Sequence, residues 1–416
     1  LARAALILGL FLGTSVDDAL IALLEEALDT VGNELSALRV RLMISLAVQL
    51  QWAPDTERRM RLAREALALA RETRDPEALS VVLSRGWALI DGSKPFDVEL
   101  GALQEEAEAV ARATGDPVAL AEALHYNAFG AACRGDRTTY EAKLDESVRI
   151  FSALRRPLFD WVNGFQTAAR AEHHGDLVLA EGLIVEAAEL GRRADVPGND
   201  LMVTVGGFLY QIRRAQGRLD EMVDTLADLV ESTPALPVLR LVLAGAYVET
   251  DRIEEGRPHY MWLAENECAN IPPDLEYAVT LCGLARMAYD VRPPVPIVEY
   301  IYEHLAPFAG RFNWSGQLLT DPNDLGLAVI DGTLGRNDDA DHHFAAAIEL
   351  CGRAGSRANL ARSHFAWARV LADRGDAPAA REHADIAIAM GEELGMDGPF
   401  GIVPRGRKLV ETLRHI

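Results

Sequence analysis

A short turn motif that ends in Gly and a polar residue recurs along this chain at intervals of about 40 residues. It reads CRGD, HHGD, AQGR, TLGR and DRGD in turn, with glycines at Gly135, Gly175, Gly217, Gly335 and Gly375. Weaker equivalents stand at Gly92, Asp251 and Val291. Because Gly readily adopts the left-handed conformation that ends a helix, each motif predicts a break between two helices. Self-similarity at such a period is the sequence signature of a repeat array.

A second set of helix breakers lies between these glycines. Its members are Pro76, Pro117, Pro157, Pro197, Pro234 and Pro272, with Ser356 and Gly395 in the equivalent places of the last units. Pro fits the first turn of a helix because its missing N–H group has no intrahelical partner there. The two sets together predict a unit of helix, Gly turn, helix and Pro turn.

Small side chains stand at fixed distances from each turn. Seven residues before the turn come Ala128, Ala168, Ala328 and Ala368, with Ala244 in a weaker unit. Five, nine and twelve residues after it come Ala180, Ile184 and Ala187, then Ala340, Phe344 and Ala347, then Ala380, Ala384 and Ala387. This pattern resembles the tetratricopeptide (TPR) repeat, although a unit of about 40 residues is longer than the 34 of that family.

The resemblance implies an all-α, TPR-like superhelix, or solenoid, of about 8–10 helical hairpins whose first helices line a concave face. Since no linker interrupts the sequence, we expect one array over 1–416. Within it we expect N-terminal capping hairpins over 1–52, central repeats over 53–308, a long loop over 309–323 and C-terminal repeats over 324–416. The apolar run over 5–13 predicts a buried helix, because nine residues are too few to span a bilayer.

A second resemblance covers the last hundred residues. The stretch EHLAPFAGR (303–311) and the segments 324–376 and 380–396 resemble the end of the helical sensor region of bacterial STAND ATPases. These AAA-type regulators are joined to class III cyclase or LuxR-type DNA-binding domains. The matching positions are Leu305 to Arg311, Leu325 to Leu327, Leu334 to Arg336, Ala361 with Arg362, and Leu394 to Met396.

Charge and cysteine content narrow the range of partners. The formal net charge is −22 and the pI about 4.9, so the field of the protein repels nucleic acids and anionic membranes. The four cysteines are far apart and form no C-x-x-C pair, which fits a reducing cytoplasm and predicts neither a disulfide framework nor a zinc site. We therefore expect a cytoplasmic protein that binds no nucleic acid and no membrane through this chain.

No catalytic motif is found. A nucleotide switch needs a Gly-Lys dipeptide in its phosphate loop, and this sequence has none. The resemblance accordingly places ATP and Mg²⁺ in a domain outside this chain, and no cofactor or metal within it. Asp321 and Asp324 are interpreted as turn and helix-capping residues, and Trp314 as a plug that closes the loop. The pairs Asp338/His342 and Asp339/His343 are interpreted as solvated helix surface, and His173 and His174 as helix-end partners.

The concave face is the predicted binding surface. Counting from the turn glycines of the middle units gives its candidates as Glu122, His125, Phe129, Phe165, Glu172, His173, Gln211 and Arg214. We expect a protein or peptide partner, or a small effector, to bind there.

Three functions compete at this stage. The first is a non-catalytic sensor arm of a larger ATPase or transcriptional regulator, which the resemblance implies switches between an ADP-bound monomer and an ATP-bound homo-oligomer. The second is a free-standing TPR adaptor. The third is a helical-toroid hydrolase that uses Asp321 and Asp324 as its carboxylate pair.

Overall fold

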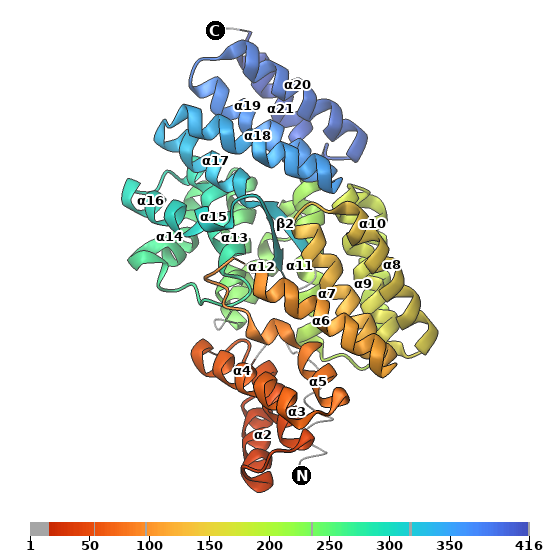
Figure 1. The fold of residues 1–416 in the computed structure, drawn as a ribbon. Coiled ribbons are helices and arrows are strands. Elements are labelled where there is room, and N and C mark those ends of the chain that lie inside the picture. Colours follow the sequence, from red (N-terminus) through yellow and green to blue (C-terminus); the bar gives the residue numbers. More distant parts are fainter. Residues whose placement is uncertain (1–15, 54, 96–97, 234–235, 316–317, 415–416) are drawn as a thin grey trace.

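The computed structural model describes residues 16–53, 55–95, 98–233, 236–315 and 318–414, and its architecture is almost entirely helical (Figure 1). The predicted helix over 5–13 lies outside the described residues. After α2 (Asp18–Val31), the chain forms successive pairs of helices and ends with α21 (Ile402–Thr412). The helical hairpin is therefore the repeating unit, as predicted.

The first helices of the pairs are α3 (Ala37–Gln49), α5 (Pro76–Leu83), α7 (Pro117–Cys133), α9 (Pro157–His174), α11 (Gly198–Gln216), α13 (Pro237–Glu249), α15 (Tyr277–Val291), α17 (Asn323–Leu334) and α19 (Arg357–Asp373). The second helices are α4 (Thr56–Thr73), α6 (Val98–Thr114), α8 (Arg137–Leu154), α10 (Leu177–Arg193), α12 (Val223–Ser232), α14 (Ile253–Cys268), α16 (Val295–Leu305), α18 (Asn337–Ala354) and α20 (Ala377–Leu394). Short 3₁₀ turns η1 (Gly86–Leu89), η2 (Leu219–Glu221) and η3 (Ala306–Phe308) complete the helical part.

Small side chains hold the two helices of each hairpin together. The alanines seven residues before the turn are fully buried, with 0 % exposure at Ala128, Ala168, Ala244, Ala328 and Ala368. The residues predicted to meet them on the second helices are buried in the same way, including Ile184 and Phe344 at 0 %. A methyl group at each crossing lets the backbones approach, so these positions fix the hairpin geometry.

The Gly-Asp turns have a clear local cause. Gly175 ends α9 with φ of 84°, and its N–H group donates to the carbonyl of Glu172. The next residue, Asp176, caps α10 by accepting a hydrogen bond from the backbone N–H of Leu179 at 3.2 Å. One dipeptide thus ends one helix and begins the next.

One hairpin departs from the repeat. Helix α5 has only eight residues and is followed by η1. Arg59 of α4 is fully buried beneath this segment and donates to the carbonyls of Ala88 and Ile90, at 2.7 Å each. The buried guanidinium therefore replaces the intrahelical partners that a longer α5 would supply.

The stretch predicted as a long loop contains a β-hairpin. Strands β1 (Phe312–Ser315) and β2 (Leu318–Pro322) pair antiparallel, with Trp314 opposite Leu319 and a register irregularity between Phe312 and Trp314. Apart from Ser315, the described residues of both strands are buried. Figure 1 shows β2 in the interior of the molecule, between α15 on one side and α10 and α11 on the other.

The C-terminal repeats fold back onto the middle of the array. The turn at Gly135 lies against Leu350 and Arg353, and the turn at Gly175 lies against Leu394. The turn at Gly217 is hydrogen-bonded to the segment after α20, where Phe400 donates to the Gly217 carbonyl at 3.0 Å. In Figure 1 this places α18 to α20 beside the ends of α8 to α10. The array is therefore closed on itself along the edge where these turns lie, rather than being an open arc.

We predict that Gly217→Ala destabilises the fold. Gly217 has φ of 77°, and an added Cβ would lie 2.1 Å from the backbone nitrogen of Gly401. The midpoint of thermal unfolding should therefore fall. Gly182→Ala is the matched control, because Gly182 lies inside helix α10 with nothing within 4 Å of an added Cβ. This variant should keep the wild-type midpoint or raise it, because Ala in place of Gly inside a helix stabilises the folded state by up to about 1 kcal/mol. Equal midpoints for the two variants would contradict the close approach.

Candidate ligand cavity

The space between the first helices and the β-hairpin is a cavity of about 430 Å³. Its lining comes mostly from α7, α9, α11, α13 and α15, with residues 314, 315, 318, 320 and 321 of the β-hairpin on one side. The volume lies within the roughly 300–1,000 Å³ typical of small-molecule sites. We call this space the central cavity.

Aromatic rings form much of the cavity wall. Four tryptophans line it, namely Trp52, Trp87, Trp161 and Trp314. Trp314 of β1 meets Tyr126 of α7 edge to face, with ring centres 6.0 Å apart. The β-hairpin therefore reaches across the concave side and packs on the first helices, as a plug.

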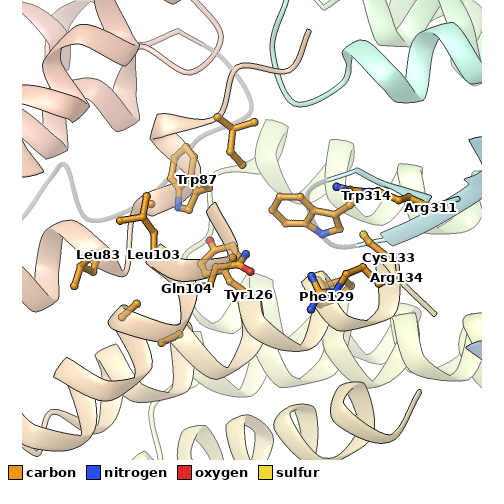
Figure 2. A pocket seen from close by; sticks show the side chains of 16 residues that line it. Leu83, Trp87, Leu103, Gln104, Tyr126, Phe129, Cys133, Arg134, Arg311 and Trp314 are labelled. Carbon is orange, nitrogen blue, oxygen red and sulfur yellow. The ribbon is translucent and has the colours of Figure 1, made fainter. Parts of the chain in front are cut away.

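A smaller pocket of about 60 Å³ adjoins the central cavity. The two share Trp87, Tyr126 and Trp314 in their linings. In Figure 2 the Trp87 and Trp314 rings stand on either side of Tyr126, and Phe129 and Cys133 follow along α7. These three shared rings separate the two spaces.

Five charged residues from five elements meet beside the cavity. Arg214 of α11 donates to Asp321 of β2, with Nη1 2.8 Å from Oδ2, and its Nε donates to Glu249 of α13 at 2.8 Å. Arg286 of α15 also donates to Glu249, and Arg362 of α19 donates to Asp321. We call this group the arginine cluster. Its members are at most 19 % exposed.

The arginine cluster is electrostatically coupled. Burial opposes ionisation of both carboxyl groups, but the surrounding guanidinium groups outweigh it. They lower the pKa of Glu249 to about 2 and that of Asp321 far below its usual range. Burial and repulsion from Arg214 lower the pKa of Arg362. Both carboxylates are therefore ionised at neutral pH, and one guanidinium charge remains in excess of them.

Two other acidic residues of the wall are shifted in the opposite direction. Burial, and then the charge of Asp274, raises the pKa of Glu276 to about 8, although the Ser315 hydroxyl donates to its carboxyl at 2.8 Å. Burial likewise raises the pKa of Glu122, against Arg85 and Ser84. Glu276 is therefore mainly a neutral carboxylic acid at pH 7, and so presents a donor as well as an acceptor.

Some polar groups on the wall lack a protein partner. Gln166 of α9 is 0 % exposed, and neither its amide nitrogen nor its carbonyl oxygen has a hydrogen-bond partner among the described residues. The Nδ1 atom of His125 likewise has no hydrogen-bond partner among the described residues. Burial lowers the pKa of this imidazole to about 3. An unsatisfied buried amide costs about 1–3 kcal/mol. These atoms are shielded from the cavity in this structure, so a ligand reaches them only if the Gln166 or His125 side chain turns.

The structure disperses the eight predicted concave-face residues over four places. Glu122, His125, Phe165, Gln211 and Arg214 line the central cavity. Phe129 lines only the smaller pocket. Glu172 is buried near the arginine cluster, where burial raises its pKa to about 7 against the opposing charge of Arg362. His173 is buried too, and its Nε2 lies 3.2 Å from the Ala354 carbonyl, in the contact with the C-terminal repeats.

Other interpretations from the sequence need correction. Asp321 is a buried partner of three arginines and not a turn residue. Asp324 stands in the first turn of α17 but accepts from the Gly310 N–H group and from His343, which lies 3.1 Å away and is only 15 % exposed. His343 is therefore not solvated surface, whereas Asp338, Asp339 and His342 are exposed. Since Asp324 does not line the central cavity, the proposed hydrolase pair faces no common space there.

Four residues of the site were not predicted from the sequence. Arg362 stands among the positions that resemble the STAND sensor region, but that resemblance predicts no role in a site. Arg286 has no motif around it, and Gln166 and Glu276 are single polar residues in helices or turns. Arg286 stands ahead of the last turn of α15, whereas Arg214 lies in the last turn of α11, so counting from the helix ends does not find it. For Arg286, Gln166 and Glu276 the sequence carries no signal.

Two wider properties follow from the described residues. None of the helices in that part of the chain is long and apolar enough to cross a membrane. Within the same residues, no three His, Cys, Asp or Glu side chains are grouped so that they would hold a metal ion. All four cysteines are buried as free thiols.

Comparisons with known proteins give distant similarities only. No protein-family model matches the chain, and no curated protein matches its sequence. Among solved structures, it is similar to a chain of Naa15/Naa10 bound to HypK-THB, with 13 % identity and a TM-score of 0.20 over 99 % of this chain. It spans 65 % of the length of that chain. It is also similar to a circular tandem repeat protein with novel repeat topology and enhanced subunit contact surfaces, with 15 % identity and a TM-score of 0.14 over 100 % of this chain and 96 % of the other.

We predict that Asp321→Asn strongly destabilises the protein. The change leaves Arg214, Arg286 and Arg362 with one carboxylate instead of two. Removing one partner of a buried ion pair typically costs about 3–5 kcal/mol. Urea unfolding at pH 7 measures the loss. Asp338→Asn, at an exposed position, is the control and should unfold at the wild-type urea concentration. Equal stability of the two variants would contradict the buried ion pairs between Asp321 and the three arginines.

Glu276→Gln should flatten the dependence of stability on pH. The Glu276 carboxyl has its ordinary pKa of 4.5 in the unfolded chain and about 8 in the folded one. Between these values the folded state holds more protons, so the free energy of unfolding falls as pH rises. Gln keeps an acceptor for Ser315 but does not titrate.

The measurement is urea unfolding at pH 5, 6, 7 and 8. One proton changes the slope by at most about 1.4 kcal/mol per pH unit. We expect the variant to gain stability relative to wild type as pH rises from 5 to 8. Glu65→Gln, exposed on α4, should keep the wild-type slope. Parallel profiles for wild type and Glu276→Gln would refute the shift.

Proposed function

We propose that this chain is the effector-binding sensor of a larger signal-transduction ATPase or transcriptional regulator, and that it takes a small organic molecule into the central cavity. In this proposal the chain itself is non-catalytic, and ATP and Mg²⁺ bind to another domain of the parent protein. The regulator context is supported by the resemblance of residues 303–311 and 324–396 to STAND sensor regions.

The observation that carries the proposal is the central cavity itself. It has about 430 Å³ of space, aromatic walls and a fully buried Gln166 without a partner in the described chain. Small-molecule sites combine an apolar wall with a few convergent polar groups in this way. A fold that needed no ligand would gain stability by filling the space and removing the amide.

The β-hairpin offers a route from the ligand to the rest of the protein. Trp314 and Asp321 line the cavity, and the carbonyl of their neighbour Thr320 accepts from Asn359 of α19 at 3.2 Å. A ligand that touches the hairpin therefore acts on the contact between the middle and C-terminal repeats. By linkage, it shifts the parent protein between states only if it binds those states with different affinity.

The cavity favours this function over the two alternatives. A TPR adaptor would hold its partner in an open groove along the first helices, and here the β-hairpin occupies that side, with Trp314 packed on Tyr126 of α7. A hydrolase using Asp321 would need a carboxyl group free to exchange protons, and that carboxylate is held by three arginines.

A cavity-filling variant tests the proposal. Gly207 of α11 lines the cavity and has nothing within 4 Å of an added Cβ, so Gly207→Leu places a side chain in the empty space. Gly182→Leu replaces a helix glycine that also has open space around it but does not line the cavity. The probe is the neutral apolar dye Nile red, followed by its fluorescence and by quenching of the cavity tryptophans.

We expect wild type to bind Nile red saturably at one site, Gly182→Leu to bind it equally well, and Gly207→Leu to bind it at least about tenfold more weakly, a loss of roughly 1.4 kcal/mol. Thermal unfolding of both variants checks that they are folded. Absence of saturable binding, or equal binding by Gly207→Leu, would reject the cavity as the site and favour the adaptor function.

A further inference from the structure

We propose that the ligand of the central cavity is an organic anion, whose carboxylate is bound by Arg286 beside Arg214 and whose apolar body lies along the aromatic wall. The inference rests on the proposed function, because it names the class of molecule that enters the same cavity. It is carried by the charge balance of the arginine cluster, the unused donors of Arg286 and the composition of the wall.

The charge balance favours an anion. Three guanidinium groups share two carboxylates in the arginine cluster, which leaves one positive charge to be neutralised. Glu172 is a further acidic group beside the cluster, and burial raises its pKa to about 7, so near neutral pH it offsets only part of the excess charge. It does not line the cavity. A buried charge is stable only when it is paired, so the cluster is completed by one more negative group.

The donors of Arg286 show where that group binds. All three nitrogens of the Arg214 guanidinium already donate to Asp321 or Glu249, and its side chain is 3 % exposed. Arg286 lines the cavity with a side chain that is 16 % exposed. Its Nη1 donates to Glu249, and its buried Nε lies 3.4 Å from Asp321 Oδ2 in an ion pair. Nη2 is therefore the nitrogen of Arg286 that is left without a hydrogen-bond partner among the described residues and is not buried. A guanidinium group has five N–H donors in a planar fork that matches a carboxylate.

The other charged groups of the wall disfavour a cation. Glu122 and Glu276 are biased towards their neutral forms by burial. Asp321 is occupied by arginines, and Asp200 stands in the first turn of α11, where the helix dipole favours its negative charge. Arg85 adds a further positive charge to the lining. An amine would therefore meet no carboxylate that needs a partner.

The rest of the wall describes the body of the ligand. It is dominated by tryptophan, phenylalanine and leucine side chains, which favour an aliphatic or aromatic skeleton. Gln166 lies behind that apolar surface with its amide donor and acceptor unpaired in the described chain, and it reaches a ligand only if its side chain turns. A bound molecule that carries a hydroxyl or amide group on its skeleton would satisfy this residue as well.

Because the net charge is −22, only short-range contacts inside the cavity can attract the anion. The field of the whole protein repels anions at long range, so the attraction that selects the ligand must come from the buried guanidinium groups. Affinity for the anion is therefore sensitive to single substitutions at Arg286, and insensitive to surface arginines.

Two matched pairs of probes test the inference on the full chain. The first pair is decanoate and 1-decanol, and the second is 2-naphthylacetate and 2-(2-naphthyl)ethanol. Decylamine is the cationic counterpart of the first pair. Each is measured at pH 7.5 by its displacement of bound Nile red and by isothermal titration calorimetry. The two pairs distinguish an aliphatic from an aromatic skeleton.

We expect the acid of at least one pair to bind about tenfold or more tightly than its alcohol, since hydrogen bonds between two charged groups are about twice as strong as those between neutral ones. Decylamine should bind more weakly than the alcohol. Arg286→Gln should abolish the preference for the acid, and Arg286→Lys should retain part of it. Arg149→Gln, at an exposed position of α8, should keep the wild-type preference.

Equal affinity for acid and alcohol in both pairs would overturn the inference, as would tighter binding of the amine or no displacement by any of the five probes. Each of these results leaves the cavity as a Nile red site, so it differs from failure of the proposed function, in which Nile red itself does not bind. If Arg286→Gln does not fold, the wild-type ranking of acid, alcohol and amine still decides, together with Arg286→Lys.

Discussion

The ion pairing of three arginines with Asp321 is the interaction on which the shape of this molecule depends. The arginines come from α11, α15 and α19, and the carboxylate from the β-hairpin, 107 positions along the chain from Arg214. Such a buried cluster is costly to desolvate, so its value lies in geometry rather than in net stability. It fixes where the hairpin stands, and the hairpin in turn forms one wall of the central cavity.

Closure changes how the repeats contribute to stability. An open solenoid is stabilised by each unit and its immediate neighbours. Here the Gly135 and Gly175 turns also pack on Leu350 and Leu394 of the C-terminal repeats, and one apolar core runs through both parts. Removing the last repeats would therefore expose the middle ones and open the cavity, instead of shortening the array by one unit at a time. A progressive loss of stability on truncation, the expectation for an open arc, no longer follows.

The sequence could predict whatever depends on local periodicity. Alanines such as Ala128 and Ala368 are buried because every hairpin needs the same crossing, so they recur at a fixed distance from a turn. Trp314 as a plug was predictable from one large apolar residue in a polar stretch. The pairing of Asp321 with Arg214 was not, since it joins residues related by closure of the chain and by no repeat. The unpaired amide of Gln166 could not be predicted either, because the residues next to it in the sequence do not show whether its amide has a hydrogen-bond partner.

The cavity and the closure share the same residues, and this gives ligand binding a mechanical consequence. Asp321 lines the cavity on one side and receives Arg362 of the C-terminal repeats on the other. An anion that neutralises Arg286 also relieves the repulsion that Arg286, together with Arg214, exerts on Arg362. The pairing of Arg362 with Asp321 is strengthened as this repulsion falls. A ligand anion would thus hold the two parts of the array together, so that occupancy of the cavity and closure of the chain become one equilibrium.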